Sequence, residues 1–149
     1  MNKLVIFAMA VCLPLRHLSL TSGYGYRIHP VTGQYRFHAG VDLKARNDTV
    51  FAVMPGVISA TGHDPLLGVY IRLHCIPFEV NYGHLSQIFV LPGDSVYCGE
   101  PIGKSGATGR VTGEHLHFSV SFNGHAINPL KFLLSVINNL NQIKKENQP

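Results

Sequence analysis

His115-Leu-His-Phe-Ser-Val-Ser-Phe122, followed by Asn123-Gly124, is the stretch of sequence that decides the fold. Its apolar and polar residues alternate strictly. Successive side chains of a strand point to opposite faces, so this pattern predicts a half-buried β-strand. Asn-Gly favours the two-residue turn of a β-hairpin. The apolar side chains belong to the core, and both histidines face the other way.

Upstream, short β-prone runs are separated by turn residues such as Pro55-Gly56 and Pro92-Gly93-Asp94, with no helical pattern between them. The predicted runs are 50–54, 57–60, 69–74 and 78–85. Strands at this spacing indicate a mainly β fold, an antiparallel β-sandwich or barrel-like domain. The 15 Gly and nine Pro are spread along the chain, and a helical bundle would not tolerate this.

One helix is predicted to close the chain, over about residues 129–145. Asn128 is suited to the N-cap, and Pro129 to the first helical position. An apolar stripe at helical spacing follows, formed by Leu130, Leu133, Leu134, Ile137 and Leu140. The expected domain therefore covers residues 14–145.

Residues 1–13 differ from this domain in composition. Lys3 is followed by about ten apolar residues, and Ala8-Met9-Ala10 offers an A-x-A cleavage site. This resembles a short secretory signal and is too short to span a membrane. It predicts export to the periplasm, cell envelope or outside, with no stable membrane insertion after signal removal. The alternative is the first apolar strand of a truncated domain.

Composition excludes several classes of protein. An apolar fraction of 46% and a charged fraction of 13% exclude a disordered chain. The net charge of +4 comes without a basic run longer than Lys144-Lys145, so we expect no nucleic-acid partner. Cys12, Cys75 and Cys98 have no C-x-x-C spacing. Buried thiols are the favoured interpretation, and one disulfide outside the cytoplasm is the alternative.

Three short motifs offer metal-binding chemistry. His115 and His117 share one face of a strand, and His38 and Asp42 would point the same way in an extended chain with Gly40 between them. Imidazole and carboxylate are normal zinc ligands. His38, Asp42 and one histidine of the 115/117 pair would leave a fourth position for water, as in catalytic zinc sites. His84 and the remaining histidine are then candidates for proton transfer.

Taken together, the ordered motifs resemble the lysostaphin/LytM-type zinc metalloendopeptidases. They are Gly25-Tyr-Arg-Ile-His-Pro30, His38-Ala-Gly-Val-Asp42, Tyr82-Gly-His-Leu-Ser86, Gly93-Asp94 and Thr112-Gly-Glu-His-Leu-His-Phe118. The resemblance runs from about residue 15 to 133. It implies a compact antiparallel β fold with an open groove and one Zn²⁺ per chain. It also implies hydrolysis of peptide bonds in peptidoglycan stem peptides or cross-bridges.

Carried over by position, the resemblance makes His38, Asp42 and His117 the zinc ligands. It makes His84 and His115 the two other histidines of the active site. His115 would take the proton of a metal-activated water, and His84 would stabilise the oxyanion or orient the water. Which of the two is the general base stays open.

The wider surroundings of the site yield further expectations. Because no H-E-x-x-H helix is present, imidazole must do the acid–base work. Glu114, next to the His-x-His strand, should point away from the metal. Arg27 and Tyr35 are candidates to line the groove, with surface or packing roles as the alternative.

Two competing functions remain at this level. One is a non-catalytic relative that binds peptidoglycan or activates another hydrolase, and the other is a zinc-stabilised structural module. The presence of all five candidate site residues favours an enzyme, whose partners would be peptidoglycan peptides and a cell-envelope assembly.

Overall fold

The structure, a computed structural model, describes residues 11–146; within the helix, the side chains of residues 136 and 139–146 lie outside this description. The strands are β1 (Leu20–Ser22), β2 (Gly25–Ile28), β3 (Tyr35–His38), β4 (Val41–Lys44), β5 (Thr49–Phe51), β6 (Gly56–Asp64), β7 (Gly68–Cys75), β8 (Phe78–Ile88), β9 (Ser95–Val96), β10 (Pro101–Ser105), β11 (His115–Phe122) and β12 (His125–Ile127). They are followed by one helix, α1 (Pro129–Glu146). The predicted mainly antiparallel β fold with one C-terminal helix is confirmed.

Strand β11 lies inside the main sheet, whose order is β1-β4-β11-β8-β7-β6-β9. Its apolar residues Leu116, Phe118 and Val120 are buried, as the alternation predicts. The Asn123-Gly124 turn is also confirmed, because both residues have positive φ and the chain returns as β12. Phe122 departs from the prediction. At the end of β11 it is 41% exposed, and its ring packs against that of Phe78.

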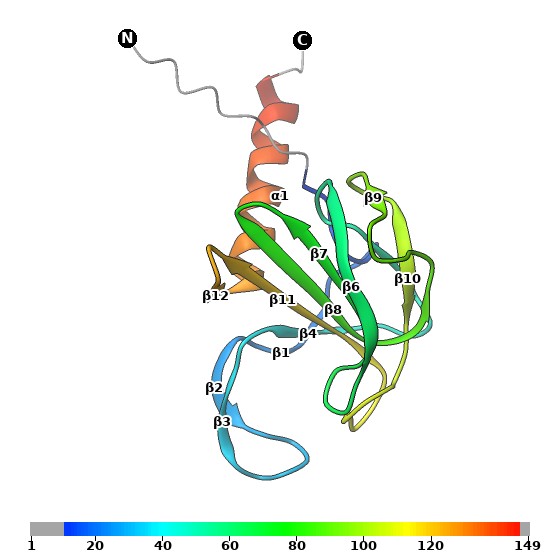
Figure 1. The fold of residues 1–149 in the computed structure, drawn as a ribbon. Coiled ribbons are helices and arrows are strands. Elements are labelled where there is room, and N and C mark those ends of the chain that lie inside the picture. Colours follow the sequence, from blue (N-terminus) through cyan, green and yellow to red (C-terminus); the bar gives the residue numbers. More distant parts are fainter. Residues whose placement is uncertain (1–10, 147–149) are drawn as a thin grey trace.

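Strand β8 curls the sheet by changing partner along its length. Residues 78–83 pair with β11, whereas Leu85 to Ile88 pair with β10, which in turn pairs with β5. The sheet therefore bends round a core lined by Tyr82 and Phe118, both fully buried. Figure 1 shows β10 beside the β6–β7–β8 layer, with α1 behind it. His84 lies at the point where β8 changes partner.

Strands β2 and β3 form a separate two-stranded sheet, called here the hairpin. It projects from the main sheet at the lower left of Figure 1. The chain bends at Ala39 and Gly40 between β3 and β4, so His38 and Asp42 do not lie on one extended strand as expected. They still converge because the bend folds the end of the hairpin over β4.

The helix begins as predicted, with Asn128 Oδ1 accepting a hydrogen bond from the Leu130 amide at 3.0 Å. Leu133 is fully buried, and Leu130 packs against the core. Leu134 was predicted to belong to the apolar stripe that packs on the core, but this prediction is wrong, because Leu134 is 47% exposed. The helix packs on the sheet along a narrow line that includes Phe132, which contacts Phe78. Leu140 lies outside the described side chains.

The favoured interpretation of three buried thiols is wrong. Cys12 and Cys98 form a disulfide across a sequence separation of 86 residues. The N-terminal segment runs along the domain, where Cys12 N–H donates to Val53 O at 2.7 Å and Phe51 N–H donates to Pro14 O at 2.9 Å. These bonds bring the two cysteine Cα atoms to 5.9 Å, within the range a disulfide spans. Cys75 is unpaired.

Residues 11–13 thus make contacts with the domain, while the predicted cleavage site at residues 8–10 lies outside the described residues. Within residues 11–146, no helix has the length and apolar character needed to cross a membrane.

Candidate metal centre

The five candidate residues meet on one side of the main sheet, although they come from four strands. Pairing of β11 places His117 opposite Asp42 on β4 and opposite Gly83 on β8. His38 arrives from the end of the hairpin. Gly40 is required at the bend, because a Cβ atom there would lie 2.7 Å from Cε1 of His117. Gly40 was expected to leave room between His38 and Asp42 on one extended strand; the structure shows instead that the missing side chain makes room for the His117 ring.

The three predicted ligand atoms form a compact triangle. His38 Nε2 lies 3.2 Å from His117 Nδ1 and 3.4 Å from Asp42 Oδ1, and His117 Nδ1 lies 3.1 Å from Asp42 Oδ1. In a tetrahedral zinc site with bonds of about 2.0–2.1 Å, neighbouring ligand atoms are separated by about 3.3–3.4 Å. His38, Asp42 and His117 therefore fit a single zinc-sized cation.

The hydrogen bonds of His38 add a chemical reason for a cation. Its Nδ1 lies 2.9 Å from Gly23 O, and since a carbonyl oxygen only accepts, Nδ1 carries the proton. In the neutral ring Nε2 then has a lone pair directed at the carboxylate of Asp42. Two acceptors facing each other are stabilised by a positive ion between them. Proteins orient histidine ligands in this way, by a hydrogen bond from the ring nitrogen that does not bind the metal.

His115 and His84 are anchored in the same way. His115 Nδ1 donates to Gly113 O at 2.9 Å, and His84 Nδ1 donates to Thr108 O at 2.8 Å. Their rings meet edge to face, with centroids 4.7 Å apart. His115 Nε2 lies 3.5 Å from Asp42 Oδ1. Both neutral rings thus have an Nε2 that can accept a proton, on a side chain held by the backbone.

His84 has an unusual backbone conformation, with φ at 60°. A positive φ is strained for a residue other than glycine, and such residues concentrate at functional sites. Here β8 changes partner, and the His84 amide leaves the ladder to donate to Leu67 O at 2.6 Å. This departure from the regular strand places the His84 ring against His115 and His117.

Burial and charge act differently on these groups. Burial alone would raise the pKa of Asp42, but the neighbouring side chains of His115, His117 and His38 hold it well below its usual range. Burial lowers the pKa of His84 to about 4, against a smaller rise from the bond to Thr108. Burial also lowers the pKa of His115, but the bond and charge of Asp42 outweigh it and raise the pKa overall. The site thus keeps Asp42 ionised and His84 neutral near pH 7.

The five residues line one cleft of about 550 Å³ between the hairpin and the sheet. Arg27 also lines it, and its Nη2 lies 3.6 Å from Asp42 Oδ2. Tyr35 does not line it; it is 71% exposed and stacks on Tyr26 outside. Glu114 points away as expected, accepting a hydrogen bond from the Asn47 amide in a separate pocket. Of the two candidate groove residues, only Arg27 belongs to the cleft.

The segment 106–113 closes the side of the cleft opposite the hairpin as a tight connection. Thr108 Oγ1 donates to Leu85 O at 2.7 Å and accepts the Val69 amide at 3.0 Å. Gly68 and Gly109 have positive φ and let the two loops pack backbone to backbone. From the sequence, the Gly- and Thr-rich stretch 105–113 could be a mobile groove wall or a tight connection into the His-x-His strand, but neither Thr108 nor Arg110 stands out, because a threonine in a glycine-rich loop gives no signal of its tertiary partners.

Comparisons with known proteins agree with this geometry. The model of peptidase family M23 matches residues 36–129. The DD-carboxypeptidase/endopeptidase Mpg of Neisseria meningitidis serogroup B is 40% identical over 124 residues, covering 81% of this chain and 28% of that protein. The peptidoglycan DD-endopeptidase ShyC of Vibrio cholerae is 42% identical over 106 residues, covering 69% of this chain and 24% of that protein. The chain therefore spans about a quarter of the length of these relatives.

Among solved structures, the catalytic domain of the antimicrobial peptidase lysostaphin from Staphylococcus simulans superposes with a TM-score of 0.68. It is 34% identical, and the match covers 78% of this chain and 92% of that one. The family match, residues 36–129, includes all five residues of the cluster, which come from β3, β4, β8 and β11. The predicted resemblance is confirmed, and the chain belongs to peptidase family M23.

Proposed function

We propose that this chain is a zinc-dependent endopeptidase that hydrolyses peptide bonds in peptidoglycan stem peptides or cross-bridges. The observation that carries this proposal is the convergence of five side chains in one cleft. Three ligand atoms are spaced for one ion, and two further imidazoles, each held at Nδ1 by a backbone carbonyl, leave their Nε2 free. A structural zinc site has no need of the two additional histidines.

In this proposal His38, Asp42 and His117 hold the metal. Bound there, zinc would polarise a peptide carbonyl and lower the pKa of water toward about 7. His115 Nε2 lies 3.5 Å from Asp42 Oδ1 and is therefore beside the three metal ligands. In this proposal His115 would accept the proton of the water and return it to the leaving amine. His84 would orient the water or, once protonated, donate to the oxyanion.

The substrate class rests on the relatives and on the shape of the site. The name of ShyC describes a peptidoglycan endopeptidase, and lysostaphin is described as a peptidase. In this chain the cleft is open along the sheet and is bounded by the hairpin and by segment 106–113. An extended peptide fits such a cleft, whereas a non-catalytic relative would not require two anchored imidazoles beside the metal cluster.

Export to the periplasm or cell envelope belongs to the same proposal. The disulfide between Cys12 and Cys98 supports an oxidising compartment. The predicted cleavage after Ala10 would keep both cysteines in the mature chain. Peptidoglycan itself lies outside the cytoplasm, so an exported protein would meet this substrate.

The decisive experiment incubates the purified zinc-loaded protein with peptidoglycan of several wall types and identifies released muropeptides by mass spectrometry. We expect cleavage that stops on chelation. His115→Ala should keep its zinc and lose about 10²- to 10⁴-fold in rate, the usual contribution of general acid–base catalysis. His74→Ala, an exposed histidine on β7, is the matched control and should cleave normally.

No product from any wall would contradict the enzyme and favour the peptidoglycan-binding relative. Unchanged turnover by His115→Ala would contradict its role as the base while leaving the hydrolase intact.

A further inference from the structure

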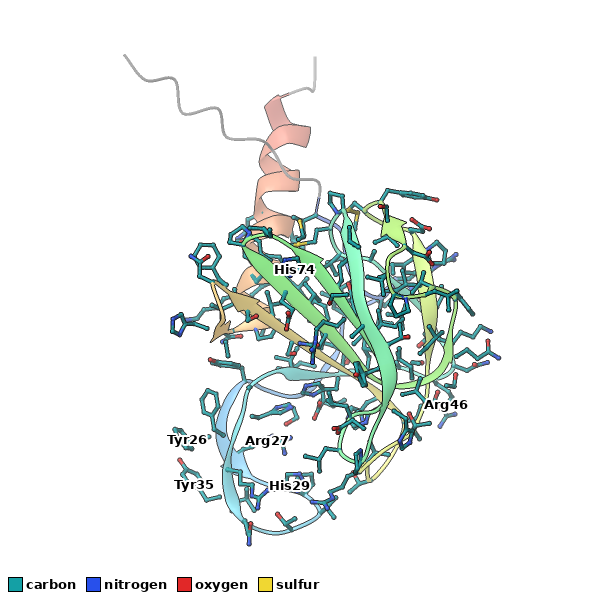
Figure 2. The ribbon with its side chains drawn as sticks, viewed as in Figure 1. Tyr26, Arg27, His29, Tyr35, Arg46 and His74 are labelled. Carbon is teal, nitrogen blue, oxygen red and sulfur yellow. A yellow bond between two sulfur atoms is a disulfide. The ribbon has the colours of Figure 1, made fainter. Side chains whose placement is uncertain are left out.

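The hairpin carries two arginines whose pairing does not stabilise the hairpin itself. Arg27 and Arg36 are directly opposite each other in the β2–β3 register. Like charges directly opposite in a sheet are destabilising. Both side chains line the cleft, whereas Tyr26 and Tyr35 are on the outer face (Figure 2). Both arginines thus lie on the inner face of the hairpin, toward the metal cluster, with Arg27 half-buried and Arg36 exposed.

A third arginine faces them across the cleft. Arg110 belongs to segment 106–113, where its amide donates to Leu66 O at 3.1 Å, and its side chain lines the same cavity. His29 begins the loop that joins β2 to β3, and it lines the cleft together with these arginines (Figure 2). After burial, the charges of Arg27, Arg36 and Arg110 are the main causes that lower its pKa. The three guanidinium groups therefore act on one region of the cleft.

The negative charge available to these arginines is small. Among the residues that the structure describes, Asp42 is the only acidic one lining the cleft, and it takes part in the cluster of histidines. Arg27 reaches Asp42, but its Nε is buried with no hydrogen-bond partner among the described residues. Within the described part of the chain, the Arg36 side chain donates only to Gln34 Oε1, at 3.0 Å. Among the side chains that the structure describes, neither Arg36 nor Arg110 forms an ion pair.

We propose that Arg36 and Arg110, from opposite walls of the cleft, bind a free carboxylate of the peptide substrate. This inference rests on the proposed function and adds a specificity determinant to it. Guanidinium groups match the geometry of a carboxylate and form charge-assisted hydrogen bonds with it. The ligand is the acidic end of a peptide whose scissile bond lies at the histidine cluster, so the chain would prefer peptides that carry a carboxylate near the cleaved bond.

The test compares two versions of one cross-linked stem-peptide fragment, with its free carboxylates intact or converted to amides. Wild-type protein, Arg36→Gln, Arg110→Gln and the double variant are assayed with both. Arg46→Gln is the matched control, because Arg46 is exposed and lines a separate pocket, and Figure 2 shows it at the right, away from the hairpin. Arg36 and Arg110 are also exposed, so their replacement should not affect folding.

We expect wild-type KM to be about tenfold higher for the amide than for the acid, the usual effect of losing a hydrogen bond to a charged group. In the double variant this ratio should fall to about one with kcat little changed, while Arg46→Gln keeps the wild-type ratio. Equal KM values in the wild type, or a ratio that survives the double substitution, would overturn the inference and leave the hydrolase standing.

If neither peptide is cleaved, the proposed function fails, and the inference is then decided by binding. Calorimetric titration of the His115→Ala variant with each peptide gives two Kd values. Their ratio, amide over acid, then takes the place of the KM ratio. A preference for the acid that disappears when Arg36 and Arg110 are also replaced supports the carboxylate subsite. Equal affinity, or no binding of either peptide, overturns it.

Discussion

The main sheet and the hairpin build the same cleft by different physical means. The sheet supplies Asp42, His84, His115 and His117 from strands whose other faces are packed in the core, where Phe118 is fully buried. The hairpin supplies His38 and Arg27 from a two-stranded unit whose outer face shows Tyr35 71% exposed. Side chains on the sheet are positioned by burial. Those on the hairpin depend on contacts made across the cleft.

This difference indicates how the centre is assembled. A two-stranded hairpin has little stability of its own in water. Here it is joined to the sheet by the contacts of His38 and Arg27 with Asp42, and by Tyr24, whose hydroxyl donates to Ala126 O at 3.2 Å. An ion bound by His38 on one side and by Asp42 and His117 on the other would connect the two regions directly.

The largest effect is expected from removing His117, one of the two metal ligands that the main sheet supplies. His117→Ala should lose its zinc, from one ion per chain to none, because only His38 and Asp42 remain as protein ligands. Hydrolysis should be lost together with the metal. Metal analysis after dialysis measures this. Ser119→Ala, two residues along the same face of β11, is the control and should keep its zinc. Wild-type zinc content in His117→Ala would remove the ligand assignment.

The second test compares an aromatic residue from each region. Phe118→Ala removes a fully buried ring and should lower the free energy of unfolding by about 3–5 kcal/mol. Tyr35→Ala loses only its stacking on Tyr26 and should cost no more than about 1 kcal/mol. Urea denaturation followed by circular dichroism compares them. Similar losses would mean that the hairpin shares the stability of the sheet.

The smallest effect concerns the contact between the two regions at Arg27. Arg27→Gln removes the charge beside Asp42 Oδ2 and should weaken zinc binding about 10- to 100-fold, the usual effect of losing a partner of a metal ligand. Competition with a chromophoric chelator gives the affinity. Arg46→Gln serves again as the control. Wild-type affinity in Arg27→Gln would show that Asp42 is positioned by the sheet alone.

Several parts of this structure were predictable because their causes are local. The alternation over residues 115–120 and the Asn123-Gly124 turn follow from strand and turn geometry, and the helix start follows from Asn128 and Pro129. The burial of Leu134 and Phe122 was mispredicted. The periodicity of apolar residues tells which side chains share one face of a helix or strand, but not how much of that face is covered by the core. The roles of His38, Asp42, His84, His115 and His117 remain predictions, although the fold brings these residues together.

Other features had no local cause to read. The disulfide between Cys12 and Cys98 depends on where the N-terminal segment lies, and the positive φ of His84 on the change of partner along β8. Likewise, Thr108 O meets His84 only because two glycines allow two loops to touch. The opposition of Arg27 and Arg36 depends on hairpin register, and their approach to Arg110 on the placement of a separate loop.

By itself, the sequence determined the residue types, the strand periodicity and the order of the histidine motifs, because these express chemistry and short-range geometry. Only the tertiary structure decided which nitrogen of each histidine faces the cleft and which oxygen of Asp42 meets them. It also decided that a projecting hairpin completes the centre. The physical reason is that these outcomes depend on long-range strand pairing and on backbone carbonyls, whose positions no local pattern of side chains specifies.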